Sequence, residues 1–235
     1  MKRTLRAPLA LLTLLLVASA AVALVARADS ADQRGNGNPL PLSAAPSGQL
    51  QEPDPLIKQR TKGDPAAPIT VYEVSDFQCP YCRVFAEEIL PQLDREYIAQ
   101  GKLQIVFVNF PLVQIHANSA AAHEFAMCAA QQDRFWPIHD LLFRTQETWS
   151  RQAEPAGFFM GLADSATLDR DSLTACIETG AVRWLVEAEA TAVARQGVDR
   201  TPSFIVERML IAGAQDVDVW RSVLDSLFAA KTGGD

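Results

Sequence analysis

From residue 69 onward, the chain alternates between the apolar patterns of strands and of helices. Two runs rich in Ile, Val and Phe, Ile69–Phe77 and Leu103–Phe110, predict β-strands. The second run is almost unbroken, as in a strand at the centre of a sheet. Between them the pattern predicts a helix that reaches about Gln100, with Pro91 expected to kink it. Its apolar residues, spaced by four, are Phe85, Ile89 and Leu93.

The second half of the chain is first helical and then mixed. Residues 116–197 carry helical patterns throughout and end in a glycine, a common helix stop. The runs Pro202–Val206 and Met209–Ala212 predict a β-hairpin, and Val217–Ala230 predicts an amphipathic closing helix. Because Glu207-Arg208 stands where an Asn-Gly pair would favour a tight turn, a two-residue type I′ turn is not expected. The order is strand, helix, strand, helical block, two strands, helix, which predicts an α/β fold.

Residues 1–28 have the character of a targeting segment. Three basic residues among the first six precede a charge-free run, Ala7–Ala26, that is rich in Leu, Ala and Val. Its length matches what a helix needs to cross a bilayer, which favours a retained N-terminal membrane anchor. The triplet Ala26-Arg27-Ala28 also fits a small-x-small cleavage site, so a cleaved signal peptide stays open. Either way, the basic residues should remain cytoplasmic and the rest of the chain should be exported.

The remaining sequence divides into a linker and one domain. Residues 29–61 are rich in Pro, Gly, Asn, Gln and Ser and have too few large apolar residues to fold, so we interpret them as a flexible linker. Residues 62–235 are long enough for one domain. A formal net charge of −7 and a pI near 5.0 argue against nucleic-acid binding. All four cysteines lie in the exported part, in a compartment where disulfides persist.

The candidate chemistry lies at Cys79-Pro80-Tyr81-Cys82, between the first predicted strand and the helix that follows it. A helix N-terminus offers free backbone N–H groups and the positive end of the helix dipole, and both stabilise a thiolate. We expect the Cys79 thiol to point outward there. The Cys82 thiol should lie one turn further in, where it can attack a mixed disulfide formed by Cys79. This spacing is typical of a thiol–disulfide exchange site.

Two other interpretations of the Cys-x-x-Cys motif have less support. A structural zinc site needs two further Cys or His ligands, usually at short spacing. The remaining candidates are scattered: Cys128, Cys176, His116, His123 and His139. An inert structural disulfide at this spacing would close a loop too small to add much stability. We therefore predict a redox site with no metal and no cofactor.

Four groups of residues around this site form a recognisable set. They are Phe77-Gln78-Cys79-Pro80-Tyr81-Cys82, Phe110-Pro111-Leu112 with His116, Met127 to Gln132 with Phe135-Trp136 and His139-Asp140, and Gly197-Val198 with Thr201 to Phe204. The set resembles the DsbA-like thiol:disulfide oxidoreductases of the exported bacterial branch, over essentially all of residues 69–230. The resemblance implies a thioredoxin fold with an inserted all-helical domain, about residues 116–197, between the second and third core strands.

The resemblance also implies roles for individual residues. Cys79 would be the nucleophile that forms the mixed disulfide with a client protein, and Cys82 the buried resolving cysteine. Pro202 would follow a cis peptide bond, which brings the Thr201 backbone opposite the active-site disulfide to pair with a client strand. Arg200 stands where such proteins usually have glycine, and it adds a charge beside the client groove. The client-binding residues would be Pro80, Tyr81, Thr201 and Pro202.

Glu73 is predicted to point into the domain, because it lies six residues before Cys79, where related folds carry a buried acid. We hypothesise that Glu73 relays a proton to or from Cys82, with its carboxyl pKa raised by burial. The alternative is an edge glutamate that reaches solvent. Asp76 is closer in sequence but falls on the other face of the strand, so we interpret it as a helix-capping or loop residue.

We predict a second, structural disulfide between Cys128 and Cys176, which both fall in the helical block. A loop of this size would contribute about 3–4 kcal/mol in the chain-entropy model. The alternative is a pair of buried free thiols. His123 and His139 are interpreted as packing and hydrogen-bonding residues.

Together these features predict an exported thiol:disulfide oxidoreductase that exchanges a Cys79–Cys82 disulfide with client proteins and oxidises them as they fold. We expect it in the periplasm or at the outer face of the cytoplasmic membrane, anchored by residues 7–26. Its partners would be exported proteins with cysteines and a membrane quinone-linked protein that re-oxidises it, or an electron donor if it acts as a reductase. An exported reductase, an isomerase and a membrane-tethered chaperone or binding module remain alternatives; an isomerase would need a dimerisation domain.

Overall fold

The computed structural model describes residues 40–41 and 54–233. The predicted signal peptide or anchor, including the apolar run 7–26, and most of the predicted linker lie outside these residues. Within the described residues, no helix combines the length and the apolar character that crossing a bilayer requires.

The centre of the fold is a six-stranded sheet with the strand order β1-β6-β5-β3-β4-β2. The strands are β1 (Leu40–Pro41), β2 (Thr61–Lys62), β3 (Ile69–Ser75), β4 (Leu103–Asn109), β5 (Ser203–Val206) and β6 (Met209–Ala212). β3 and β4 pair in parallel, from Ile69 opposite Leu103 to Ser75 opposite Asn109, and the other pairs are antiparallel. The four predicted strands are therefore present. The two-residue strands β1 and β2 had no detectable sequence signal.

A continuous helical segment begins at Pro80, directly after Cys79, and contains Cys82. It consists of α1 (Pro80–Val84), the π-helix η2 (Phe85–Ile89), α2 (Leu90–Leu93) and the π-helix η3 (Asp94–Ile98). Pro91 lies in the first turn of α2, just where the wider π turn ends and the Leu90 N–H bonds to the Phe85 carbonyl five residues back. Because Pro91 has no N–H to donate, one helical hydrogen bond is missing at this junction. The wider π turns accommodate that gap.

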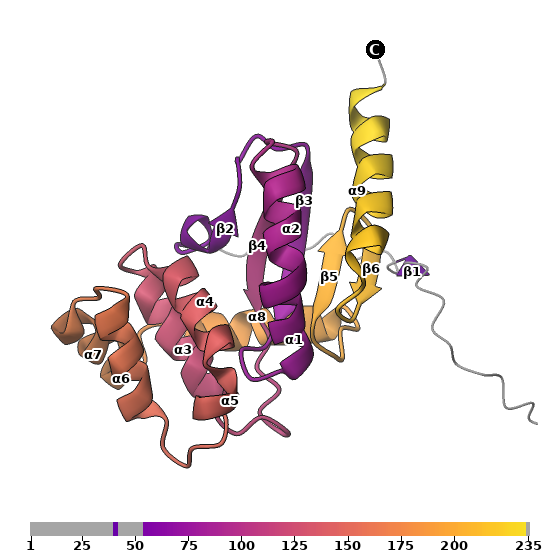
Figure 1. Ribbon diagram of the computed structural model, residues 1–235. Coiled ribbons are helices and arrows are strands. Elements are labelled where there is room, and N and C mark those ends of the chain that lie inside the picture. Colours follow the sequence, from indigo (N-terminus) through magenta and orange to yellow (C-terminus); the bar gives the residue numbers. More distant parts are fainter. Residues whose placement is uncertain (1–39, 42–53, 234–235) are drawn as a thin grey trace, which may run out of the picture. The chain divides into compact units, whose positions relative to one another are not determined.

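The helical insertion lies between β4 and β5, the second and third core strands, as the predicted fold requires. Its helices are α3 (Ser119–Ala130), α4 (Phe135–Arg144), α5 (Gln146–Trp149), α6 (Ala156–Ser165), α7 (Arg170–Thr179) and α8 (Arg183–Arg195). Figure 1 shows α3 to α7 gathered together beside the sheet, whereas α8 runs across behind the strands. The chain then forms the β5–β6 hairpin and the closing helix α9 (Val217–Thr232).

Helices cover both faces of the sheet. On one face, residues of β3, β4 and β5 pack against the helical segment that begins at Pro80 and against α9. The Phe204 ring contacts Phe85 at a tilt and Trp220 edge to face (centroids 4.4 and 4.8 Å). On the other face, Val74 packs with Val193 of α8. The hydrophobic core of the insertion continues to the end of the sheet, and both active-site cysteines belong to this core. The site therefore lies at the junction of the two cores.

The β5–β6 hairpin confirms that no type I′ turn joins its strands, although the connection is short. Val206 pairs directly with Met209, so two residues connect the strands. Of the two connecting residues, Glu207 alone has a positive φ (54°). A type I′ turn needs positive φ at both, so the turn is of another type.

A buried arginine corrects the predicted end of the linker at residue 61. Arg60 ends the short 3₁₀-helix η1 (Lys58–Arg60) and is completely buried. Its guanidinium donates to Glu189 on α8 (2.7 and 3.1 Å), to Asp54 and to the carbonyl of Phe107 on β4. Residues 54–61 therefore belong to the domain. The sequence analysis missed the burial of Arg60, because a charged residue in a polar stretch is normally expected to be solvent-exposed.

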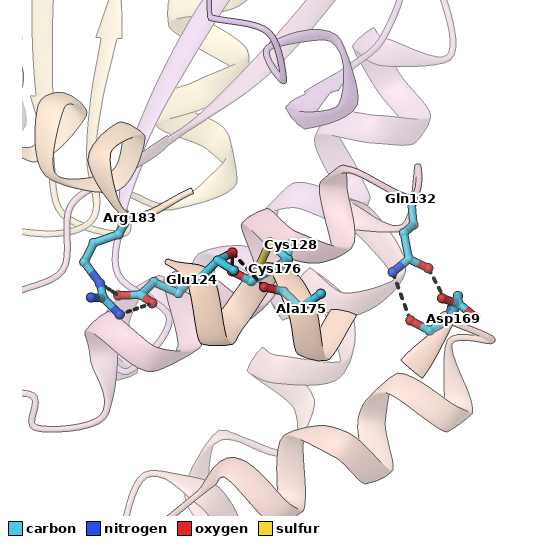
Figure 2. The surroundings of a disulfide bond; sticks show 8 residues. Glu124, Cys128, Gln132, Asp169, Ala175, Cys176 and Arg183 are labelled. Carbon is cyan, nitrogen blue, oxygen red and sulfur yellow. Dashed lines mark hydrogen bonds and ion pairs between the residues drawn. A yellow bond between two sulfur atoms is a disulfide. The ribbon is translucent and has the colours of Figure 1, made fainter. Parts of the chain in front are cut away.

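The disulfide between Cys128 and Cys176 is present and joins α3 to α7. Two polar contacts flank it (Figure 2). On one side, Gln132 exchanges two hydrogen bonds with the backbone of Asp169, the N-cap residue of α7 (2.8 and 3.2 Å). On the other side, Glu124 forms a two-pronged ion pair with Arg183 of α8 (2.8 and 3.1 Å). The second half of α3 and the residues that follow it are thus attached to α7 and α8.

Replacing Arg60 by methionine should lower the free energy of unfolding by about 3 kcal/mol, because Glu189 and Asp54 would lose their shared buried cation. Urea unfolding of the purified protein measures the change. The control is Arg170→Met, which removes an ion pair with Asp164 that is half-exposed on both sides. Exposed pairs contribute little. Equal stability of the two variants would contradict a structural role for residues 54–61.

Replacing both Cys128 and Cys176 by alanine should lower the free energy of unfolding by about 3–4 kcal/mol, because the unfolded chain loses its cross-link. Urea unfolding under non-reducing conditions tests this. With Cys79 and Cys82 both replaced by serine, so that the active-site pair cannot respond, adding reductant should destabilise the protein by a similar amount and should leave the same protein without Cys128 and Cys176 unchanged. Equal stability of parent and variant without reductant would be inconsistent with this role.

Candidate active site

The two remaining cysteines lie where β3 ends and α1 begins. Cys79 is the N-cap residue of α1, with extended backbone angles (φ −73°, ψ 124°), and Pro80 takes the first helical position. Proline suits this position, because its missing N–H would have no partner within the helix. Cys82 lies in the first turn and is completely buried. Both thiols are free in this structure.

Cys79 is less exposed than the sequence suggested, with only 5% of its surface accessible. Two segments from elsewhere in the chain cover it. Its thiol donates a hydrogen bond to the carbonyl of Thr201 (3.4 Å), and the Thr201–Pro202 peptide bond is cis. From the insertion, the buried Gln146 side chain donates to the carbonyls of Phe77 (2.7 Å) and Cys79 (2.9 Å). The fold therefore brings Cys79 beside Thr201, 122 residues away in sequence.

The two thiols have opposite acidities. A hydrogen bond from the Cys82 thiol, together with the backbone N–H groups of Cys82 and Tyr81, lowers the pKa of Cys79 to about 6 despite its burial. Burial and the neighbouring Cys79 raise the pKa of Cys82 well above its ordinary value. At neutral pH, Cys79 is therefore the thiolate and Cys82 the thiol. This arrangement suits Cys79 to nucleophilic attack.

Glu73 points into the domain from the middle of β3. It is completely buried, opposite Phe107 of β4 and Phe204 of β5, so it is not a solvent-reaching edge residue. Neither carboxyl oxygen has a hydrogen-bond partner among the described residues. Burial raises the pKa of Glu73 to about 7. A carboxyl group with this pKa can both donate and accept a proton near neutral pH.

Asp76 is the functional residue that the sequence reasoning undervalued. It is a loop residue, as expected, but Cys79 and not Asp76 caps the helix. Its buried carboxylate accepts four hydrogen bonds, from the backbone N–H groups of Gln78 (2.8 Å) and Leu112 (2.9 Å), the Ser119 hydroxyl (2.5 Å) and the His116 ring (2.8 Å). These bonds join the active-site turn to the start of the insertion. The sequence did carry one signal for this role. Asp76 comes directly after β3, and the parallel neighbour β4 ends at the same edge of the sheet.

The other predicted residues around the cysteines differ in their exposure to solvent. Pro80 and Tyr81 are exposed, Tyr81 by 67%, whereas Thr201 and Pro202 are buried. Arg200 is exposed and forms an ion pair with its neighbour Asp199 (2.7 Å). Among the described residues, no group of three or more His, Cys, Asp or Glu side chains is arranged to hold a metal ion.

Comparison with known sequences agrees with this geometry. The family model Thioredoxin_4, described as thioredoxin, matches residues 56–226. Disulfide bond formation protein D of Bacillus subtilis is 26% identical over 179 residues, which cover 75% of this chain and 81% of that protein. The probable disulfide bond formation protein D of Bacillus anthracis is 38% identical over 89 residues, 38% of this chain. That alignment spans only 41% of the Bacillus anthracis protein.

Comparison with solved structures gives the same picture. BdbD from Bacillus subtilis, in its oxidised form, has a TM-score of 0.66 at 25% identity, over 73% of this chain and 94% of that structure. Wolbachia pipientis alpha-DsbA1 has a TM-score of 0.66 at 20% identity, over 73% and 92%, and supports the fold alone. This chain therefore belongs to the thioredoxin family, and its sequence and fold are similar to those of the disulfide bond formation proteins D and of DsbA-like proteins.

Proposed function

We propose that this protein is an exported oxidase of protein thiols, which donates a Cys79–Cys82 disulfide to client proteins. The observation that carries the proposal is the contrast between an acidic Cys79 and a buried, weakly acidic Cys82. A stabilised Cys79 thiolate favours the reduced site, so the oxidised site is a better oxidant of its clients. With a pKa of about 6, Cys79 lies between thioredoxin, at about 7, and DsbA, at about 3.5.

The exchange proceeds in two displacements. A client thiolate attacks the Cys79 sulfur of the oxidised site, the Cys79–Cys82 bond breaks, and Cys82 leaves as a thiolate that takes up a proton. A second client thiolate then attacks the client sulfur of the mixed disulfide, and Cys79 leaves as a thiolate. The client gains a disulfide and the site gains two electrons. We propose that a membrane quinone-linked partner removes these electrons.

The client would bind beside the Thr201–Pro202 peptide. The Thr201 carbonyl contacts the Cys79 thiol, so a client strand paired with this backbone would bring its own sulfur to Cys79. The exposed Tyr81 ring, beside the cysteines in sequence, offers an apolar surface to residues flanking the client cysteine. Backbone pairing would explain how one site accepts clients of different sequence.

Glu73 would supply and remove the Cys82 proton. Because Cys82 is completely buried and its pKa is high, its thiolate needs a proton donor within the domain as it leaves. Glu73 is the buried acid of β3 whose pKa of about 7 allows both directions of transfer. We propose that water carries the proton between Glu73 and Cys82.

The reduction potential of the Cys79–Cys82 pair should lie above about −180 mV, the range of protein disulfide isomerase and stronger oxidants. Equilibration of the purified full chain with glutathione buffers, followed by thiol trapping, measures it. A value near −270 mV, that of thioredoxin, would mean that the site works as a reductase. An exported electron donor would then replace the quinone-linked partner.

Replacing one cysteine at a time separates exchange from mere binding. Cys79→Ser should abolish oxidation of a reduced client. In Cys82→Ser, the Cys79 thiolate should attack a client supplied with its disulfide already formed, displace one client thiolate and remain trapped as a mixed disulfide, because no Cys82 thiol is left to resolve it. Non-reducing electrophoresis detects this adduct. A Cys79→Ser protein that retains full activity would instead identify a chaperone or binding module.

Glu73→Gln should slow attack of Cys82 on a Cys79–client mixed disulfide by about tenfold or more at pH 8. In the parent protein this step should accelerate as the pH rises through about 7, because the Glu73 carboxylate then accepts the Cys82 proton. The variant should lose this acceleration. Rapid-quench analysis of the purified mixed disulfide measures both rates. Unchanged rates and an unchanged pH profile would exclude the relay.

The matched control is Glu87→Gln on the exposed side of the following helix, which should leave the rate unchanged. Stability provides a second check. Folding raises the Glu73 pKa, so between pH 4.5 and about 7 the folded state holds a proton that the unfolded state has lost. The parent protein should therefore lose stability as the pH rises through this range. The Gln variant should lack this loss, so slow exchange without destabilisation would identify a role in proton transfer.

A further inference from the structure

A buried negative charge lies directly at the turn that carries the two thiols. The Asp76 N–H points to the Cys82 sulfur (3.4 Å), and the Asp76 carbonyl accepts the N–H of Cys79 (3.0 Å). Four hydrogen bonds, together outweighing its burial, keep the pKa of the Asp76 carboxyl below its usual value. The carboxylate is therefore charged at every pH at which Cys79 titrates. An unbalanced buried carboxylate here would oppose the formation of a thiolate.

His116 is placed to balance this charge. Its Nδ1 lies 2.8 Å from an Asp76 carboxylate oxygen, and its side chain is 15% exposed, so the outer part of the ring reaches solvent. Backbone hydrogen bonds from His116 to Leu112 (2.9 Å) and from Ser119 to His116 (3.1 Å) fix the loop that carries it. The hydrogen bond to Asp76 raises the pKa of His116, and the nearby Cys79 charge raises it further. The ring therefore favours its cationic form beside a reduced site.

The other charged and titratable groups around Asp76 do not replace this cation. His123 of α3 lies 3.9 Å from Asp76, but burial lowers its pKa to about 4, so it is neutral when Cys79 titrates. Its other ring nitrogen contacts Asn109 (2.7 Å), which in turn bonds to Glu189. Glu189 is already paired with Arg60. Between the cysteines, Pro80 and Tyr81 carry no positive charge.

We propose that Asp76 and His116 form a positioning pair that keeps the Cys79 thiol acidic. Asp76 fixes the turn through its hydrogen bonds, and the His116 imidazolium cancels the electrostatic cost of the Asp76 carboxylate at the thiols. The loop before the insertion thus supplies the cation that the Cys-Pro-Tyr-Cys turn lacks. The consequence for client oxidation rests on the proposed function, but the acidity of Cys79 is measurable without any client.

A double-mutant cycle tests the charge balance. The thiolate absorbance near 240 nm is followed against pH in the full chain with only the Cys79–Cys82 pair reduced. It reports Cys79, because Cys128 and Cys176 stay disulfide-bonded and Cys82 titrates much higher. His116→Gln should raise the pKa of Cys79 by about 0.5–1 pH unit, since it leaves the carboxylate unbalanced. Asp76→Asn should not raise it. The double variant should return most of the way to the parent value.

The control is Arg170→Gln, which removes another cation paired with an aspartate, Asp164 (2.6 Å), where both side chains are half-exposed. It should leave the pKa of Cys79 unchanged. If the loop served only to hold the turn together, His116→Gln and the double variant would raise the pKa alike. That result, or no shift in His116→Gln, would overturn the proposal.

A measurement on the unmodified protein keeps the proposal testable if a variant fails to fold. Linkage is reciprocal, so a cation that stabilises the Cys79 thiolate must itself be stabilised by it. An NMR titration should therefore give His116 a higher pKa in the reduced protein than in the oxidised protein. Equal values would contradict the proposal. A Cys79 pKa above 8 in the parent protein would instead undermine the proposed thiol chemistry itself.

Discussion

The parallel pairing of β3 with β4 is the constraint on which the rest of the site depends. Seven consecutive residue pairs, from Ile69–Leu103 to Ser75–Asn109, set both strands in one register, and the Phe110 N–H continues it by bonding to the Ser75 carbonyl (3.0 Å). In a parallel pair, both carboxyl ends lie at the same edge of the sheet. The cysteine turn after β3 and the loop after β4 therefore meet, although more than 30 residues separate them.

This meeting makes the insertion part of the active site. Gln146 of α5 holds two carbonyls of the cysteine turn, and the Gln78 side chain accepts the backbone N–H of Asn118 (2.8 Å). Buried carbonyls and amides require such partners, since an unsatisfied polar group would cost more than the hydrogen bond contributes. The insertion thus fixes the geometry of Cys79 and shields it from solvent. Its cross-link between Cys128 and Cys176 stabilises α3, the helix that follows His116.

Sequence periodicity predicted the four core strands, the inserted helices and the closing helix, because each buries a regular apolar face. The inward position of Glu73 was predicted instead from the buried acid that related folds carry six residues before the first cysteine. Periodicity missed β1 and β2, whose two residues carry no periodic pattern, and it missed Arg60, whose buried position depends on Glu189 129 residues away. The role of Asp76 was likewise hidden, since three of its partners lie 36 to 43 residues away. Long-range polar contacts leave no local pattern, and these produced most of the errors.

The two buried acids of this site, Glu73 and Asp76, carry the same carboxyl group, but their surroundings shift its pKa in opposite directions. Glu73 has no hydrogen-bond donor among the described residues, so burial dominates and its pKa rises into the range where protons are exchanged. Asp76 is almost equally buried, but four donors reverse the effect and hold it ionised. An acid that stays charged cannot shuttle protons, and an acid that titrates cannot provide a constant field. Glu73 and Asp76 lie three residues apart in sequence. Under the roles we propose, proton transfer at Cys82 and electrostatic control of Cys79 therefore fall to two different carboxyl groups.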